Sequence, residues 1–215
     1  MEKTVSFTTL APYFVMGEYT AATRHLWIVC HGHGQLARYF AKRFDILDLQ
    51  RHTIIAPQGP DRFYMDNYTR VGASWTTREN RDMHIENQLN YLDVVFEAET
   101  KNVDFQTTRL HLLGFSQGVS AITRWAASRH IAFDSLIMWA GGFPPELTQQ
   151  PWSWIKPDAK FFSVVGKEDE FLTEERLEEQ KKLISAAFEN CEFIMFDGKH
   201  EMNRAVLAAL VEKIS

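Results

Sequence analysis

The feature of this sequence that most constrains its fold is a short run bounded by glycines, Gly114-Phe115-Ser116-Gln117-Gly118. Residues 110–113, directly before it, are continuously apolar, as in a strand that is buried on both faces. Residues 119–125, directly after it, carry apolar side chains at the spacing of one helix face. Two glycines allow the chain to turn tightly between a strand and a helix. The run therefore predicts a sharp strand–turn–helix unit with Ser116 at its corner.

The same alternation of strand and helix patterns continues through most of the chain. We expect buried strands at residues 26–30, 53–56, 110–113, 135–140, 161–165 and 193–196. Helical periods separate most of these strands, which predicts an α/β fold with a mostly parallel central sheet and helices on both faces. Residues 4–10 and 13–19 have no helix between them, so we expect them to pair as an antiparallel N-terminal edge. Residues 61–82 lack a clear period and predict a long functional loop.

Length and charge narrow the classes of protein to which the chain can belong. With 215 residues we expect a single domain over residues 1–215, without a separate lid domain. The net charge of −5, with no basic stripe, argues against a nucleic acid as partner. No apolar stretch reaches the roughly 18 residues that span a bilayer, and the N-terminus lacks the pattern of a signal peptide. We therefore expect a cytoplasmic protein without a membrane span.

Glycine-rich or polar loops follow four of the expected strands. These loops are residues 31–34, 114–118, 141–142 and 166–169. The carboxyl ends of parallel strands meet at one edge of the sheet, and ligands bind at that edge. The four loops should therefore come together, and we predict a functional site where they meet.

Ser116 is the predicted nucleophile of that site. A serine in a G-x-S-x-G corner projects its hydroxyl into the cleft, and the helix that follows directs its free N–H groups at a developing negative charge. A glycine pattern of five residues also arises by chance, and a serine can simply cap a helix. The strand before the run and the helix after it favour the nucleophile, because a serine at an ordinary helix cap would not need both glycines.

The loop His31-Gly32-His33-Gly34 is the second expected part of the site. Where a G-x-S-x-G corner is used for catalysis, a loop of this kind supplies one backbone donor to the oxyanion, and the residue after the serine supplies the other. We assign the backbone N–H groups of His33 and Gln117 as this oxyanion hole. We expect the ring of His31 to bond to loop carbonyls. No metal site is expected, because two histidines without a nearby third ligand bind metal poorly.

A histidine that follows Ser116 in the chain should act as the base. His130 and His200 are the two histidines after Ser116. His130 stands at the end of the helix after Ser116 and is expected on the surface. His200 follows the last expected strand and precedes the last helix, so its loop reaches the same edge of the sheet as Ser116. His200 is therefore the predicted base.

A carboxylate between Ser116 and His200 should orient the base. Asp169 lies just beyond the strand at residues 161–165 and is the predicted acid. Glu170 follows it directly and stays open as the alternative. These three positions, Ser116, Asp169 and His200, form the predicted catalytic triad.

With these motifs in place, the chain resembles the phospholipase/carboxylesterase family of α/β-hydrolases, which includes acyl-protein thioesterases. The resemblance extends over nearly the whole chain and rests on Cys30-His31-Gly32-His33-Gly34, Gly114-Phe115-Ser116-Gln117-Gly118, Gly166-Lys167-Glu168-Asp169 and Gly198-Lys199-His200. It implies an α/β-hydrolase fold, no cofactor, a shallow acyl site and a homodimer. The chain departs from the family at His33 and Gln35, where an apolar and an acidic residue are usual. These departures leave the substrate open.

Three side chains are candidates for the wall of a substrate pocket. Trp75 lies in the long loop, Phe143 follows the strand at residues 135–140, and Met202 is close to the predicted base. Ordinary packing of loops on the core explains each of them equally well.

The predicted function is hydrolysis of a small-molecule carboxylic ester or thioester through an acyl-Ser intermediate. An amidase or peptidase would use the same triad, although a chain of this size offers little surface for a large peptide. A third reading is a non-catalytic binding protein with a hydrolase fold. Such a protein would be expected to have lost a triad residue, and none is missing.

Overall fold

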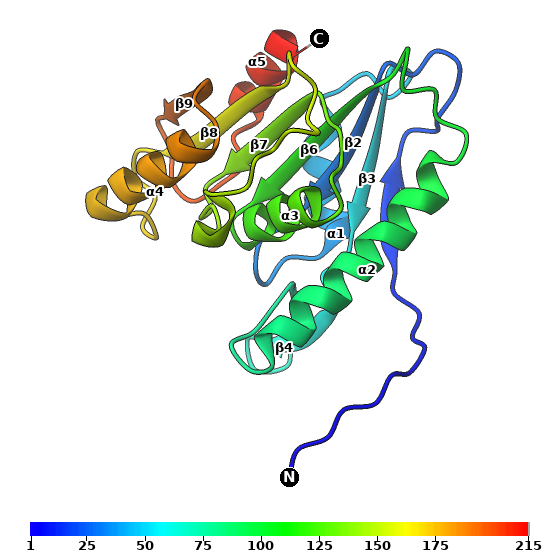
Figure 1. The fold of residues 1–215 in the computed structure, drawn as a ribbon, viewed down its shortest axis with the longest axis vertical. Helices are drawn as coiled ribbons and strands as arrows, with labels where there is room; N and C mark the ends of the chain where they lie inside the picture. Colours follow the sequence, from blue (N-terminus) through cyan, green and yellow to red (C-terminus); the bar gives the residue numbers. More distant parts are fainter. Residues whose placement is uncertain (215) are drawn as a thin grey trace.

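A seven-stranded sheet forms the centre of the computed structural model, which describes residues 1–214 (Figure 1). The strands lie in the order β1-β3-β2-β6-β7-β8-β9, and all neighbours are parallel except β1 and β3. Their bounds are β1 Tyr13–Met16, β2 His25–Cys30, β3 His52–Pro57, β6 Arg109–Phe115, β7 Ser135–Trp139, β8 Lys160–Gly166 and β9 Cys191–Phe196. The mostly parallel sheet with an antiparallel N-terminal edge is confirmed.

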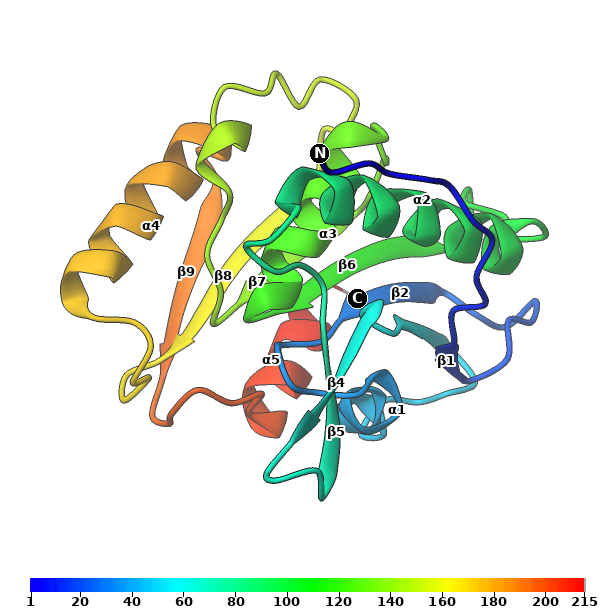
Figure 2. The same cartoon turned by 90° about the horizontal axis from the view of Figure 1, so that it is seen from below.

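Helices cover both faces of this sheet (Figure 2). One face carries α2 (Arg81–Thr100), α3 (Gln117–Ser128) and α4 (Glu174–Ala187). The other carries α1 (Ala37–Phe40), the 3-10 turn η1 (Ala41–Phe44) and α5 (Arg204–Ile214). A further 3-10 turn, η2, spans Pro145–Leu147. The three layers match an α/β-hydrolase fold.

Strand β2 shows why the central strands have continuously apolar sequences. All six of its residues are buried. Leu26 and Ile28 belong to the apolar cluster under α2 and α3, whereas Trp27 and Val29 belong to the cluster under α1 and α5. Successive side chains of a strand point to opposite faces, so a strand between two helix layers is apolar at consecutive positions, as residues 26–30 are.

The predicted strand at residues 4–10 is wrong. This segment forms no strand and lies exposed, extending away from the sheet in Figure 1. The antiparallel partner of β1 is β3, with Tyr13 opposite Pro57 and Met16 opposite Ile54. An isolated two-stranded hairpin is marginal in water, whereas the edge of an existing sheet offers a full ladder of backbone partners.

Residues 61–82 are not the irregular loop that the sequence suggested. They contain a hairpin of β4 (Asp61–Met65) and β5 (Arg70–Ser74), which projects beyond the sheet in Figure 2. The hairpin is fastened to the loop after β2, because Gly34 N–H donates to the carbonyl of Ala73 at 2.8 Å. Its first strand alternates half-buried and exposed residues, so it lacks the apolar run of a buried strand.

Candidate active site

Ser116 occupies a strained corner between the end of β6 and the start of α3. Its backbone has φ 53° and ψ −119°. Residues other than glycine rarely adopt a positive φ, and a sparsely populated conformation of this kind costs about 1–3 kcal/mol. A hydrogen bond of 2.8 Å from Ser116 N–H to the carbonyl of Trp139 helps to hold the corner. Because Trp139 ends β7, the neighbouring strand fixes the position of Ser116.

Close backbone packing around this corner requires glycine. A Cβ at Gly118 would lie 2.1 Å from the carbonyl oxygen of Cys30, so the first turn of α3 rests directly on the end of β2. The same contact brings the loop after β2 beside the serine. A Cβ at Gly32 would lie 3.1 Å from the Cβ of Ser116.

His200 and Asp169 are joined by a hydrogen bond. His200 Nδ1 lies 2.8 Å from Asp169 Oδ2, and the other carboxylate oxygen accepts the N–H of Phe171 at 2.9 Å. The Asp169 side chain is 1% exposed and that of His200 is 16% exposed. Glu170 is exposed to solvent, so Asp169 is the acidic residue that meets the histidine.

Ser116 and His200 line the same cavity, whose volume is about 460 Å³. The other lining residues are Gln117, Ser120, Ala140, Gly141, Gly142, Phe171, Leu172, Arg176, Glu179 and Gln180. The His200 ring contacts two phenylalanines, with centroid distances of 5.0 Å to Phe115 and 4.7 Å to Phe171. Among residues 1–214, Ser116 Oγ has no hydrogen bond to His200. Such bonds commonly tighten only when substrate is bound.

The His31 ring fixes the loop that passes Ser116. His31 Nε2 accepts hydrogen bonds from Gly59 N–H at 2.9 Å and from the Gln58 amide at 3.0 Å. Its Nδ1 donates to the carbonyl of Gly32 at 2.8 Å, which confirms the expected bond to a loop carbonyl. Burial lowers the pKa of His31 to about 4, so the ring is neutral at neutral pH.

The two backbone N–H groups proposed for the oxyanion flank Ser116. Gln117 is the first residue of α3, where amides have no partner within the helix. His33 follows Gly32 on an exposed turn, and its ring stacks on Phe63 of β4 at a centroid distance of 5.0 Å. Within residues 1–214, neither N–H donates to another group of the protein. Both amides are therefore free to donate to a substrate oxygen.

A model of the phospholipase/carboxylesterase family matches residues 13–215. The chain belongs to the phospholipase/carboxylesterase family. This is a family of hydrolases, and the match includes every residue of the strained corner and of the Asp169–His200 pair. A search of curated proteins by sequence gives no match.

Solved structures with the same fold have low sequence identity to this chain. A carboxylesterase from Mesorhizobium loti has a TM-score of 0.71 at 14% identity, with 94% of each chain covered. Acyl-protein thioesterase 2 from Zea mays has a TM-score of 0.66 at 14% identity, covering 96% of this chain and 100% of that chain. The protein Atu2452 from Agrobacterium tumefaciens has a TM-score of 0.67 at 18% identity, covering 94% and 97%. At these identities the likeness establishes the fold.

The Gln117 side chain has a role that the sequence did not reveal, since only its backbone N–H was assigned. Its Oε1 accepts the N–H of Trp75 at 2.9 Å, and its Nε2 donates to the carbonyl of Thr76 at 2.8 Å. Ser74 Oγ lies 2.9 Å from the same Nε2. The amide thus clamps the end of β5 to the first turn of α3. No local sequence signal could have revealed this role, because all three partners lie more than 40 residues away in the chain.

The three predicted pocket residues do not line the cavity beside Ser116. Trp75 is 1% exposed, and its indole N–H donates to the carbonyl of His31 at 2.8 Å. Phe143 is 1% exposed and Met202 is 5% exposed, and they belong to the apolar clusters on opposite faces of the sheet. Their role is packing behind the site. The apolar wall of the cavity comes instead from Phe171 and Leu172, which precede α4.

The arrangement of side chains and helices also bears on metal binding and on membrane spanning. Among residues 1–214, no group of three or more His, Cys, Asp or Glu side chains is placed to hold a metal ion. Over the same residues, no helix combines the length and the apolar character needed to cross a membrane.

Replacement of Gly118 by alanine tests the contact between α3 and β2. We expect Gly118→Ala to lower the free energy of unfolding by about 3 kcal/mol or more, because the new Cβ overlaps backbone that cannot move aside. Gly142→Ala is the matched control, since its Cβ would have no neighbour closer than 3.7 Å. Urea unfolding of the two variants measures the difference. Equal losses of stability would contradict the packing argument.

The neutral His31 ring predicts a specific loss of stability in acid. An unfolded histidine titrates near 6.5, whereas folded His31 titrates at about 4, so the unfolded chain binds the proton first as the pH falls. Stability is complete above pH 6.5 and declines towards pH 4. Between pH 7 and pH 5 this residue accounts for about 2 kcal/mol. Urea unfolding of His31→Gln should show a pH dependence that is flatter by this amount, whereas His130→Gln, changed on the surface, should keep the wild-type dependence.

Proposed function

We propose that this protein hydrolyses small carboxylic esters or thioesters through an acyl-enzyme intermediate on Ser116. The observation that carries the proposal is the hydrogen bond of 2.8 Å between His200 and the buried Asp169, with His200 and Ser116 lining one cavity. A nucleophile, a base and a group that orients the base are the parts that acyl transfer requires.

The proton moves between Ser116 and His200. His200 Nδ1–H donates to Asp169, which leaves Nε2 unprotonated and able to take the proton of the serine hydroxyl as Oγ attacks the carbonyl carbon. The Phe171 N–H holds the second oxygen of Asp169, so the carboxylate cannot rotate away from the imidazole. The buried carboxylate then stabilises the imidazolium that forms.

The oxyanion of the tetrahedral intermediate is assigned to the backbone N–H groups of His33 and Gln117. Within residues 1–214 neither amide has a protein acceptor, and Gln117 N–H stands at the positive end of the α3 dipole. The His31 ring and the Gln117 side chain hold the two loops in place. Donors fixed before the reaction need no reorganisation as charge develops.

The second half of the reaction returns the free enzyme. The protonated His200 gives its proton to the departing alcohol or thiol, leaving the acyl group bound to Ser116. Water then attacks the acyl carbon while His200 takes one of its protons. Collapse of this second intermediate releases the carboxylic acid and passes the proton back to Ser116.

The cavity supports a small acyl group as the substrate. Its volume of about 460 Å³ lies towards the lower end of the usual range of small-molecule sites. Phe171 and Leu172 offer apolar surface next to His200, and Phe171 is 59% exposed. Short or medium acyl chains fit this wall, which is open to solvent.

Removal of the nucleophile is the first test. Ser116→Ala should abolish hydrolysis of p-nitrophenyl acetate and p-nitrophenyl octanoate and should abolish covalent labelling by a fluorophosphonate, because no other residue is assigned to attack the carbonyl. Ser120→Ala removes a second hydroxyl from the same cavity and should keep the label. A folded wild-type protein that neither turns over these esters nor takes the label would refute the proposal.

The identity of the acid is tested separately. Asp169→Asn should lower kcat by about 10⁴-fold, because an amide at this position favours the wrong tautomer of His200. Glu170→Gln changes the neighbouring exposed acid and should stay within about twofold of wild type, as expected for a surface substitution. Steady-state kinetics on p-nitrophenyl acetate measures both. A large loss in Glu170→Gln with little change in Asp169→Asn would reverse the assignment.

A further inference from the structure

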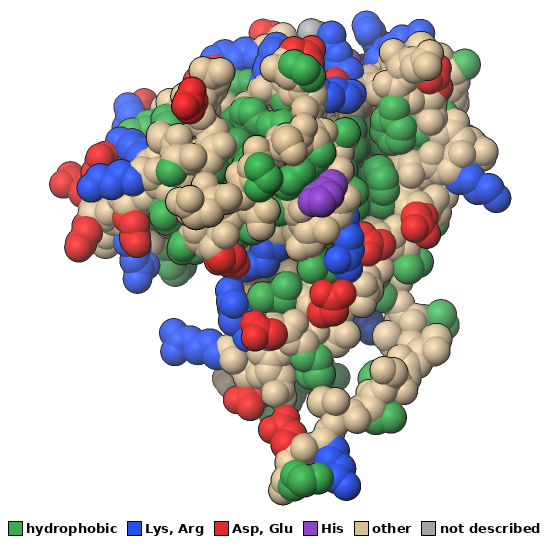
Figure 3. Space-filling view, viewed as in Figure 1, with side chains coloured by type: hydrophobic (Ala, Val, Ile, Leu, Met, Phe, Trp, Pro, Cys, Tyr) green, Lys and Arg blue, Asp and Glu red, His purple; other side chains and the backbone are tan. Residues whose placement is uncertain are grey.

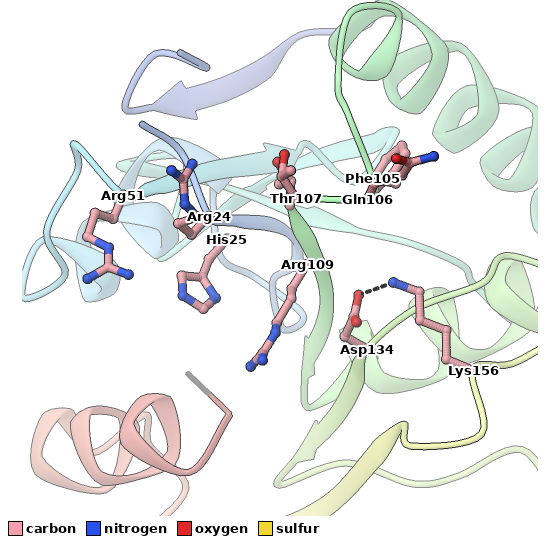
Figure 4. A pocket seen from close by; sticks show the side chains of 10 residues that line it. Arg24, His25, Arg51, Phe105, Gln106, Thr107, Arg109, Asp134 and Lys156 are labelled. Carbon is pink, nitrogen blue, oxygen red and sulfur yellow. Dashed lines mark hydrogen bonds and ion pairs between the residues drawn. The ribbon is translucent and has the colours of Figure 1, made fainter. Parts of the chain in front are cut away.

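A second cavity lies at the opposite edge of the sheet from Ser116. Its volume is about 390 Å³, and residues at the beginnings of β2 and β6 and in the turn before β3 line it (Figure 4). Parallel strands place their carboxyl ends at one edge and their amino ends at the other. This cavity is therefore separate from the proposed hydrolytic site.

Positive charge is concentrated around this cavity. Among the described residues, four basic side chains line it, together with one acidic side chain, Asp134; the basic residues are Arg24, Arg51, Arg109 and Lys156. Lys156 Nζ is 2.7 Å from Asp134 Oδ2, which pairs one cation with the acid (Figure 4). Lys and Arg side chains gather along the upper edge of the molecule in Figure 3, where the parallel strands begin. The chain as a whole carries a net charge of −5, so this concentration is local.

The three arginines have no carboxylate partner among residues 1–214. Arg24 Nη1 donates to the carbonyls of Ala21 and Thr23 at 2.8 and 2.9 Å. Arg109 Nη1 donates to the carbonyl of Ile214 at 2.7 Å. These neutral acceptors position the guanidinium groups but leave their charge uncompensated, and the Arg51 side chain has no partner in the part of the chain described.

A buried histidine adds a further polar group to the cavity. His25 is 4% exposed, and its Nδ1 lies 3.0 Å from His111 Nε2. His111 Nδ1 in turn lies 2.8 Å from Ser135 Oγ. His25 Nε2 has no partner among residues 1–214, and Figure 4 shows the ring lying between Arg51 and Arg109. The His25 ring therefore brings an unused hydrogen-bonding nitrogen to the cavity.

The histidine chain can present a donor to the cavity without gaining charge. Burial, followed by His52, Arg109 and Arg51, lowers the pKa of His25 to about 4, against an opposing effect of Asp134. The ring is thus neutral at pH 7. If Ser135 Oγ–H donates to His111 Nδ1, then His111 Nε2–H donates to His25 Nδ1 and His25 Nε2 carries a proton. A bound anion would select this set of tautomers.

We propose that this cavity binds the phosphoryl group of a small molecule. Arginine is suited to oxyanions because its planar guanidinium donates two parallel hydrogen bonds. A phosphoryl dianion matches the excess of positive charge, and His25 Nε2–H supplies one more donor. The cavity has the size of a small-molecule site, so it leaves room for the organic part of a phosphate monoester. Free inorganic phosphate offers the same chemistry and is the other source of the ligand.

Calorimetric titration at pH 7 with inorganic phosphate, with ribose 5-phosphate and with ribose tests the proposal. We expect saturable binding of both phosphates and none of ribose, with tighter binding of ribose 5-phosphate if the site takes a monoester and equal binding if it takes the free ion. Arg51→Gln should weaken the affinity at least tenfold. It removes no contact within the described residues, so its fold should be unchanged, as thermal unfolding can verify. Arg78→Gln, an exposed arginine outside the cavity, is the control and should change the affinity by less than twofold.

Either of two results in the titrations would overturn the proposal. One is the absence of saturable binding by either phosphate. The other is an equal loss of phosphate affinity in Arg51→Gln and Arg78→Gln, because the loss would then reflect the change in net charge and not a contact in the cavity. Long-range ¹H–¹⁵N spectra of the histidine rings supply an independent readout, because phosphate should shift His25 Nε2 to its protonated form in the wild type. Unchanged His25 signals in saturated protein would place the anion elsewhere.

Discussion

The contact between the first turn of α3 and the end of β2 is the constraint on which the rest of the site depends. A Cβ at Gly118 would lie 2.1 Å from the Cys30 carbonyl oxygen, so helix and strand meet backbone to backbone. The helix can approach this closely only if the chain turns sharply after β6, which forces Ser116 to φ 53°. The strain is offset by the packing of α3 on the sheet and by the Ser116 N–H bond to Trp139. Exposure of the serine hydroxyl is thus a consequence of packing.

Buried hydrogen bonds then make the loops around Ser116 rigid. Trp75 links two of them, because its indole N–H donates to His31 and its backbone N–H donates to Gln117. The His31 ring in turn forms hydrogen bonds with Gly59 N–H and with the carbonyl of Gly32. A fully satisfied network of this kind favours one arrangement of its loops, since breaking any bond leaves a buried polar group without a partner. The backbone amides assigned to the oxyanion are therefore positioned before substrate arrives.

The central strands and the tight turn at Ser116 could be predicted from sequence because their signals are local. A strand buried on both faces is continuously apolar over most of its length, as in residues 26–30 of β2, and the turn at Ser116 needs its glycines within five residues. The parts of the structure that the sequence did not predict depend on contacts between residues far apart in the chain. The β4–β5 hairpin is partly exposed and lacks an apolar run, and residues 4–10 have strand-forming residues but no partner strand. The cavity wall comes from Phe171 and Leu172, and only the folded chain shows which loops meet.

The two ends of the sheet present different groups to negative charge, backbone N–H dipoles at one end and arginine side chains at the other. At the carboxyl end, the oxyanion of the proposed reaction exists only briefly, and fixed N–H dipoles can stabilise it without attracting anions permanently. At the amino end, the positive charges of Arg24, Arg51 and Arg109 are permanent, which suits equilibrium binding of an anion. The cavity of Ser116 has one basic side chain, Arg176, and one acidic side chain, Glu179, among its described lining residues, so it carries no comparable excess of positive charge. Separating the two kinds of site at opposite ends of the strands allows one small sheet to support both.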